Sequence, residues 1–417
     1  MDRRKFLASM TIAPVAAMAA SRTQLLSTLA GLPGYSASMW TYLWDIVDEG
    51  YEQVFKNLTG NGLTSISLAT AYHAGKFLEP HNPKRKVVFL EDGTVYFNPN
   101  QRLYGRLHPR INSLVSAGHG LERVQKFADR WGMKTRAWVV CCHNTPMGTH
   151  FPDITSEDAF GDRLYHNLCP SNPDVRKYLR ALIADIASHR VETIELEALQ
   201  FQGYAHGFHH EREGIELTPA VKMLLGFCFC PACLASAKSA QVDLVSLRQF
   251  TKTKLESYFA DPTRGGAVLS SIDSLPSDLV APFLEWRKSV VLSLLADLVS
   301  VAGHTKLRQL VSVDPVAQRM VSVDVAGSAR TMGGVLALGY VRDGVSLREP
   351  LKALQSLVGD AEITLGLQLG LPESGGKKEF LDKMSVAKEI GIQSFNFYNY
   401  GFVPLENLKW IREAVAS

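Results

Sequence analysis

The stretch "DVRKYLRALIADIASHRVETIELEAL", residues 174–199, joins a helical pattern to a short strand pattern. Through residues 174–189, apolar side chains recur at the spacing of one helix face. Residues 193–199 then alternate apolar and polar side chains, as a strand with one polar face does. A helix followed by a strand is the repeating unit of parallel sheets, so this stretch predicts an α/β protein.

The same alternation recurs along the chain. We predict eight strands, at residues 65–73, 134–143, 193–199, 307–314, 319–326, 334–341, 362–370 and 394–400. Helical patterns occupy residues 174–189, 279–302, 346–358, 377–391 and 404–416. This order predicts a (β/α)8 TIM-type barrel. A doubly wound open sheet is the alternative, but no glycine-rich phosphate loop follows any of these strands.

Two long insertions interrupt the alternation. Residues 74–132 follow the first predicted strand and contain "KVVFLEDGTVYF", two short β runs around Asp92-Gly93, which is a hairpin signal. Residues 200–306 follow the third predicted strand and carry a histidine-rich loop and a cysteine cluster. We therefore predict a single barrel domain over residues 21–417, with both insertions on the face where such barrels build their sites.

The N-terminus, "MDRRKFLASMTIAPVAAMAAS", has a basic start, an apolar stretch and small residues suited to cleavage near Ala20. The pair Arg3-Arg4 followed by "KFL" is similar to the twin-arginine export motif. We predict a twin-arginine signal peptide over residues 1–20 and a periplasmic or extracellular mature protein. A disordered basic start followed by a helix is the alternative.

The composition limits the classes of partner. The chain has 417 residues, with 44 lysines and arginines against 41 aspartates and glutamates, a net charge of +3. This balance argues against a nucleic-acid partner. Because no apolar run reaches the ~18 residues that span a bilayer, we expect no membrane partner for the mature protein. The oligomeric state is not predicted.

Strand side chains alternate between the barrel interior and the surrounding helices. In "TIELEAL" this rule places Glu195 and Glu197 inside, with Glu197 nearer the carboxyl-end mouth. The next predicted strand places Arg308 and Asp314 inside. A buried carboxylate needs a partner, so we predict that Arg308 pairs with Glu195. Asp314 should then reach the mouth beside Glu197.

Two carboxyl groups at a barrel mouth suit the cleavage of a glycosidic bond. One protonates the leaving oxygen, and the other attacks the sugar or activates water. A separation of ~5–5.5 Å gives retention and ~6.5–9.5 Å gives inversion. We predict Glu197 as general acid, Asp314 as its partner, and Glu195 as a deeper residue with a structural or supporting role. The alternative is that Glu197 only caps the end of its strand.

Polar and aromatic residues at other strand ends and in the histidine-rich loop are candidate sugar contacts. They are Tyr72, His73, His143, Asn144, Tyr204, His206, His209, His210, Tyr340, Gln368 and Tyr398. The spacing of His206 and His210 would also suit a zinc ion if that stretch were helical, and a zinc-dependent hydrolase using this loop is a further alternative function. Gly203 and Gly207 argue against a helix, so we predict no metal there.

The motif "CFCPAC" places Cys228, Cys230 and Cys233 within six positions. Zinc typically takes four ligands from paired C-x2-C motifs, and no second pair exists. A fourth ligand would have to come from Cys169 or a histidine. We predict packing or a disulfide rather than a metal, and no cofactor elsewhere.

Four segments, "YHAGKFLEPHNP", "LCPSNPDVRKYL", "IELEALQFQGYAHGFHHE" and "CFCPACLASA", resemble exported glycoside-hydrolase-like barrel proteins of bacteria. The similarity runs from about residue 65 onward. It implies a (β/α)8 fold and action on a carbohydrate, without naming the substrate. Retaining barrel glycosidases commonly carry their nucleophile on the seventh strand. This chain has Gln368 there, and Glu373 comes only in the segment after the strand. Because of this departure, a barrel that binds carbohydrate without cleaving it is a second possible class of protein.

Overall fold

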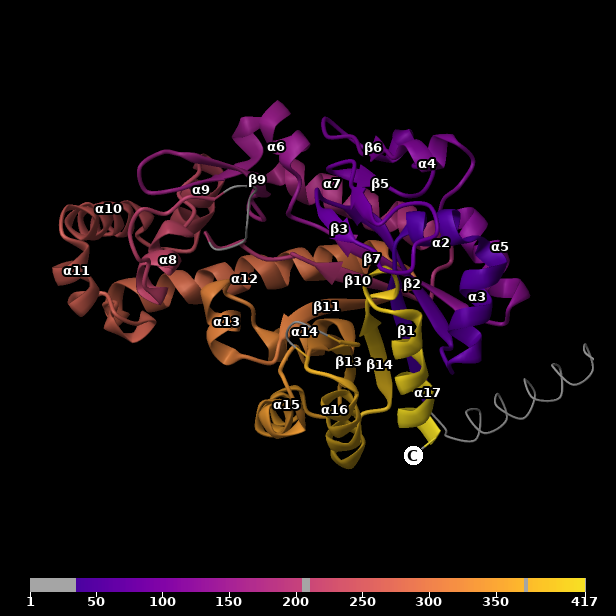
Figure 1. Ribbon diagram of the computed structural model, residues 1–417. Coiled ribbons are helices and arrows are strands. Elements are labelled where there is room, and N and C mark those ends of the chain that lie inside the picture. Colours follow the sequence, from indigo (N-terminus) through magenta and orange to yellow (C-terminus); the bar gives the residue numbers. More distant parts are fainter. Residues whose placement is uncertain (1–34, 205–210, 371–373, 417) are drawn as a thin grey trace, which may run out of the picture.

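The computed structural model describes residues 35–204, 211–370 and 374–416. Eight parallel strands close into a barrel in chain order, and β1 pairs with both β2 and β14 to seal it (Figure 1). The barrel strands are β1 (Ser36–Thr41), β2 (Ser65–Tyr72), β7 (Lys134–Val140), β10 (Thr193–Glu197), β11 (Lys306–Ser312), β12 (Gly334–Leu338), β13 (Glu362–Gln368) and β14 (Ser394–Tyr398). The predicted (β/α)8 fold is confirmed.

Helices link successive strands and cover the outside of the barrel (Figure 1). These are α3 (Tyr51–Gly60), α5 (Leu121–Arg130), α7 (Pro173–Ser188), α12 (Ser277–Val301), α14 (Val325–Met332), α15 (Gly344–Val358), α16 (Lys377–Ile390) and α17 (Leu408–Ala416). Further helices lie in the connections at α2 (Leu43–Glu49), α4 (Ser113–Ser116), α6 (Thr145–His150), α8 (Pro219–Leu225), α9 (Pro231–Ser239), α10 (Leu244–Ala260), α11 (Pro262–Val268) and α13 (Pro315–Met320). All five predicted helices are present, the last beginning as the 3-10 turn η5 (Leu405–Asn407).

The strand predictions contain two errors, one missed strand and one wrong strand. The first barrel strand, β1, was missed because "SASMWT" is rich in small residues and has no β-branched run. The predicted strand at residues 319–326 is instead the end of α13 and the start of α14. Its alternating valines suggest a strand, but Ser322 has φ +56° and the Asp324 side chain accepts a hydrogen bond from Gly327 N at 2.9 Å. That cap starts a helix.

Because one strand was missed and one was wrongly added, the strands from β12 onward keep their predicted position in the barrel. The strands before β12 each come one position later than predicted. Strand β10 is the fourth strand, so the two insertions follow the second and fourth strands rather than the first and third. The segment "KVVFLEDGTVYF" does not form a hairpin with itself. Instead β4 (Val87–Phe89) pairs with β3 (Lys76–Leu78), and β5 (Thr94–Val95) pairs with the end of β2 and with β6 (Arg110–Ile111). A hairpin of β8 (Thr155–Glu157) and β9 (Arg163–Leu168) was not predicted.

The predicted inward and outward directions of the side chains are correct on the last two strands, β13 and β14. Thr364 Oγ1 and Ser394 Oγ lie 3.0 Å apart inside the barrel. Phe397 faces outward and its ring lies 5.8 Å from that of Phe380 on α16. The period-2 rule therefore identifies which side chains reach the interior.

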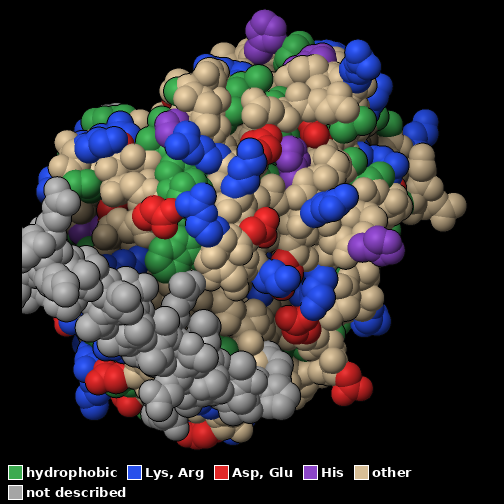
Figure 2. Space-filling model, turned by 90° about the vertical axis from the view of Figure 1, so that its right-hand side faces the viewer, with side chains coloured by type: hydrophobic (Ala, Val, Ile, Leu, Met, Phe, Trp, Pro, Cys, Tyr) green, Lys and Arg blue, Asp and Glu red, His purple; other side chains and the backbone are tan. Residues whose placement is uncertain are grey.

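The face drawn in Figure 2 has basic and acidic side chains interspersed rather than gathered by sign. No helix in the described ranges is long and apolar enough to cross a membrane. The predicted signal peptide, residues 1–20, lies outside the described residues.

Candidate active site at the carboxyl-end mouth

Glu197 is the last residue of β10 and stands at the carboxyl ends of the barrel strands. The indole Nε1 of Trp138, on the neighbouring strand β7, donates a hydrogen bond to Glu197 Oε2 at 2.5 Å. Burial raises the pKa of Glu197, and although His73 and Trp138 act in the opposite direction, the net shift is upward. A glutamic acid with a raised pKa can hold a proton for transfer near neutral pH.

An aromatic wall surrounds this carboxyl group. The ring of Tyr72 lies 4.8 Å from Trp138, and the ring of Tyr398 lies 6.1 Å from it on another side. Tyr340 stands 6.0 Å from Tyr398. These residues come from the carboxyl ends of β2, β7, β12 and β14. The structure thus brings Tyr72, Tyr340 and Tyr398 together with Glu197, as aromatic surfaces on which a sugar ring could stack.

Two predicted histidines extend this wall. His73 follows β2, and its ring stacks on Tyr72 at 4.5 Å and on His143 at 4.4 Å. His73 Nδ1 also lies 2.7 Å from the Ala74 carbonyl oxygen. The contact between His73 and His143 joins the connections after β2 and β7 at the mouth.

Other predicted contacts have structural partners. Asn144 caps α6 by accepting from Met147 N at 3.0 Å. A Cβ added to Gly93 would meet Asn144 Oδ1 at 2.4 Å, so the side chain is tightly enclosed. Gln368 is the last residue of β13 and stands beside Tyr398 in the register. Tyr204 lies after β10, and burial raises its pKa together with the charges of Glu213 and Glu211.

The remaining predicted contacts, His206, His209 and His210, lie outside the described residues, as does Glu373. Their roles stay predictions.

Glu195 lies one layer below Glu197 and is completely buried. It accepts from Ser67 Oγ at 2.7 Å and from Asn396 Nδ2 at 2.8 Å. Its cationic neighbour is Arg136, whose Nη1 lies 3.8 Å from Glu195 Oε1. The predicted pair of Glu195 with Arg308 is wrong, because Arg308 binds Glu362 on β13 instead, at 2.6 Å.

Asp314 stands just beyond β11 and is exposed. Its Oδ1 accepts a hydrogen bond from Val316 N at 2.9 Å, and it is the N-cap of α13. A capping carboxylate is stabilised by the helix N-terminus, and this role alone explains an aspartate at this position.

A group of aromatic residues at the end of β1 and just after it was missed from the sequence. Trp40, Tyr42 and Trp44 are buried at the mouth, and Tyr42 Oη donates to Tyr72 Oη at 3.0 Å. Trp44 Nε1 donates to Glu79, a fully buried glutamate whose pKa is raised by burial. The signal was present in "MWTYLW", residues 39–44, but it could not be placed without recognising β1.

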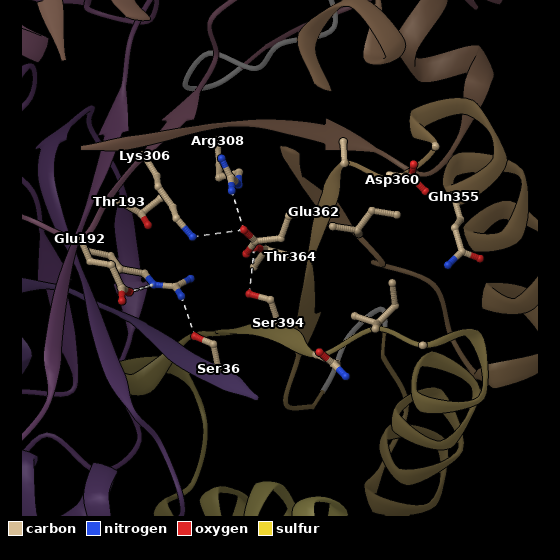
Figure 3. Close-up of a pocket in the computed structure, with 17 residues that line it drawn as sticks. Ser36, Glu192, Thr193, Lys306, Arg308, Gln355, Asp360, Glu362, Thr364 and Ser394 are labelled. Atoms are coloured by element: carbon tan, nitrogen blue, oxygen red, sulfur yellow. Dashed lines mark hydrogen bonds and ion pairs between the residues drawn. The ribbon is translucent and has the colours of Figure 1, made fainter. Parts of the chain in front are cut away.

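A cavity of about 560 Å³ opens at the opposite end of the barrel, among the amino ends of the strands (Figure 3). Its walls hold Arg308 and Lys306 against Glu362, and Arg136 Nε donates to Glu192 at 3.1 Å. We call this end the floor. Sites in barrels of this type form at the carboxyl ends, so we place the candidate site at the mouth and not in this cavity.

Away from both ends, the thiols of Cys169, Cys228, Cys230 and Cys233 converge, with all four sulfur atoms within 4.8 Å of one another. The six cysteines are free, so the predicted disulfide is not formed in this structure. These four are the group among the described residues that could hold a metal.

Fold and site together define a (β/α)8 barrel with a partly buried carboxyl group in an aromatic mouth. The sequence matches no protein-family model, and no curated protein is similar to it in sequence. Solved structures do match the fold. The chain is similar to a β-galactosidase from the psychrophilic Marinomonas ef1, with TM-score 0.53 and 8% identity over 91% of this chain and 59% of that one.

A second β-galactosidase, from Rahnella sp. R3, matches with TM-score 0.53 and 12% identity over 92% of this chain and 55% of that one. The chain therefore spans less than two thirds of either enzyme. At these identities the likeness concerns the barrel fold, which glycoside hydrolases share with many other proteins.

Proposed function

We propose that this protein is a glycoside hydrolase-like enzyme that acts on a carbohydrate at the carboxyl-end mouth, with Glu197 as general acid. The observation that carries the proposal is the setting of Glu197. Its carboxyl group is held by Trp138, enclosed by aromatic rings, and has a raised pKa. Two solved structures that share this fold are β-galactosidases, which supports a carbohydrate substrate.

In this mechanism a sugar ring stacks on the wall formed by Tyr72, Trp138 and Tyr398. Glu197 protonates the glycosidic oxygen, and the bond to the anomeric carbon breaks. The second carboxyl group activates water or attacks that carbon. We keep Asp314 as the proposed partner because it follows the strand adjacent to β10, and Glu195 as the group that positions the strand from below.

A non-catalytic carbohydrate-binding barrel is the second candidate. One observation favours it: the seventh strand offers Gln368 at its carboxyl end, and Asp314 already serves as a helix cap. An aromatic wall without a working pair of carboxyl groups would bind sugars and leave them intact.

The experiment that separates the two is a panel of oligosaccharides and polysaccharides, β-galactosides included, incubated with purified protein. The enzyme proposal expects new reducing ends from at least one glycan, detected by a reducing-sugar assay. Glycan binding by calorimetry without any cleavage would favour the binding barrel instead.

We also propose that residues 1–20 export the protein through the twin-arginine route. The translocase reads the arginine pair, so Arg3→Lys with Arg4→Lys should hold the protein in the cytoplasm. Cell fractionation and immunoblotting measure the distribution, with Lys5→Arg as the matched control. Equal export of the double variant and the wild type would contradict this proposal.

A further inference from the structure

We propose that Cys169, Cys228, Cys230 and Cys233 bind one zinc ion as a closed, structural tetrathiolate site. The four sulfur atoms lie within 4.8 Å of one another. Cys169 Sγ stands 3.4 Å from Cys233 Sγ, 3.6 Å from Cys230 Sγ and 3.9 Å from Cys228 Sγ. A zinc–sulfur bond of ~2.3 Å in a tetrahedron gives sulfur–sulfur edges of ~3.8 Å, so these spacings fit one ion.

The backbone around the cluster also favours thiolates. Cys230 is the N-cap of α9, with Pro231 in the first turn, and Cys233 follows within that turn. The partial positive charge of a helix N-terminus stabilises a thiolate there. Phe229 N donates to the Glu157 carbonyl on β8 at 2.7 Å, which fixes the segment between Cys228 and Cys230.

A buried cation beside the cluster is the second, independent observation. Arg287 on α12 is 1% exposed, and none of its three side-chain nitrogens has a hydrogen-bond partner among the residues the structure describes. Its guanidinium lies 4.6 Å from the ring centre of Phe201. A buried charge needs a counter-charge. Cys228, Cys233 and Cys169 lie near enough to Arg287 for thiolates at these positions to supply that counter-charge.

Zinc bound by four thiolates carries a net charge of two minus. Arg287 therefore has a natural counter-ion once the metal is bound, and the anionic centre has a cation in its surroundings. With four neutral thiols, the arginine would remain a buried charge without a partner, which is costly. The arginine and the thiols together indicate an anionic metal centre rather than four packed neutral thiols.

The site would join two parts of the chain. Cys169 follows β9 and precedes α7, while Cys228 and Cys230 lie between α8 and α9 and Cys233 lies in the first turn of α9. The end of α8 packs on the loop after β10, since a Cβ on Gly226 would meet Tyr204 N at 2.9 Å. Because all four positions are filled by protein sulfur, the ion has no open place for substrate, and its role is to hold this insertion on the barrel.

Metal analysis of the full chain tests the proposal directly. Protein purified without metal-affinity steps or chelators should contain about one zinc ion per chain by plasma mass spectrometry. A mercurial titration with a coloured zinc indicator should release that ion as four thiols react. Substoichiometric metal, stoichiometric iron, or disulfides among these four cysteines in mapped peptides would each overturn the zinc assignment.

Variants test the assignment to these residues. Cys230→Ser should lose the zinc and lower the melting temperature, whereas Cys142→Ser, a buried free cysteine outside the cluster, should keep the full zinc content. Arg287→Met retains all four ligands, and loss of a neighbouring group typically weakens metal binding ~10–100-fold. Competition with a chelator measures this change. Full zinc retention in Cys230→Ser, or unchanged affinity in Arg287→Met with its thiols intact, would contradict the proposed site.

Discussion

The two ends of the barrel shift the pKa of a glutamate in opposite directions. At the floor, Glu362 accepts from Arg308 Nη2 at 2.6 Å and lies 3.4 Å from Lys306 Nζ (Figure 3). Burial acts to raise the pKa of Glu362, but the two cations outweigh it and the pKa is lowered. At the mouth, no lysine or arginine among the described residues pairs with Glu197, and its pKa is raised.

This difference separates a carboxylate that supports the fold from one that can carry a proton. Glu362, held by two cations, favours its ionised form and stabilises its neighbours. An enclosed glutamate bonded to an indole costs stability when it ionises, and proteins retain such groups where they serve chemistry. The cavity at the floor is therefore a poor guide to function here, although charged residues line it.

The largest expected effect comes from Glu197→Gln, which keeps the shape and removes the transferable proton. General acid catalysis contributes ~10²–10⁴ in rate, so kcat on an identified glycan should fall by that factor while glycan binding persists. Glu362→Gln at the floor is the matched control and should retain activity. Wild-type turnover by Glu197→Gln would remove Glu197 from the mechanism.

The next effect concerns the buried carboxylate between the two ends. Arg136→Met leaves Glu195 without its cation, and removing one partner of a buried ion pair costs ~3–5 kcal/mol. Denaturant unfolding followed by circular dichroism measures the loss. The control is Arg106→Met, which breaks exposed pairs with Asp153 and Asp174 and should change stability little. Equal stability of both variants would show that Glu195 is held by Ser67 and Asn396 alone.

The smallest effect is a contrast in the pH dependence of stability. The lowered pKa of Glu362 stabilises the fold above the pKa of the unfolded chain and loses this contribution as pH falls. The raised pKa of Glu197 has the reverse sign, because the folded protein then binds more protons than the unfolded chain. At neutral pH, Glu362→Gln should lower the melting temperature, and Glu197→Gln should leave it unchanged or raise it.

In acid, both differences should shrink, which scanning calorimetry at several pH values can follow. A lower melting temperature for Glu197→Gln at neutral pH would give Glu197 a structural role like that of Glu362.

The barrel was predictable because helix and strand periods are local properties of the sequence. Residues 193–199 and 394–400 alternate so clearly that their inward faces were assigned correctly. Strand β1 was not predictable in this way, because its small residues acquire strand geometry only from pairing with β2 and β14.

The partners of side chains were harder to predict than their orientations. Arg308 and Arg136 both face inward near Glu195, and the register across three strands decides which one reaches it. The fourth member of the cysteine cluster could not be identified from the sequence for the same reason. Cys169 is 59 residues from Cys228, and only the folded chain brings the two together.

The central claim is that Glu197 keeps its proton at a pH where an ordinary glutamate is ionised, and it can be tested without a substrate. Infrared difference spectra of wild type minus Glu197→Gln, recorded across a pH series, isolate the carbonyl band of this one carboxylic acid. The band should persist above the ordinary glutamate pKa of about 4.3. A band that disappears at or below that pH would contradict a raised pKa of Glu197.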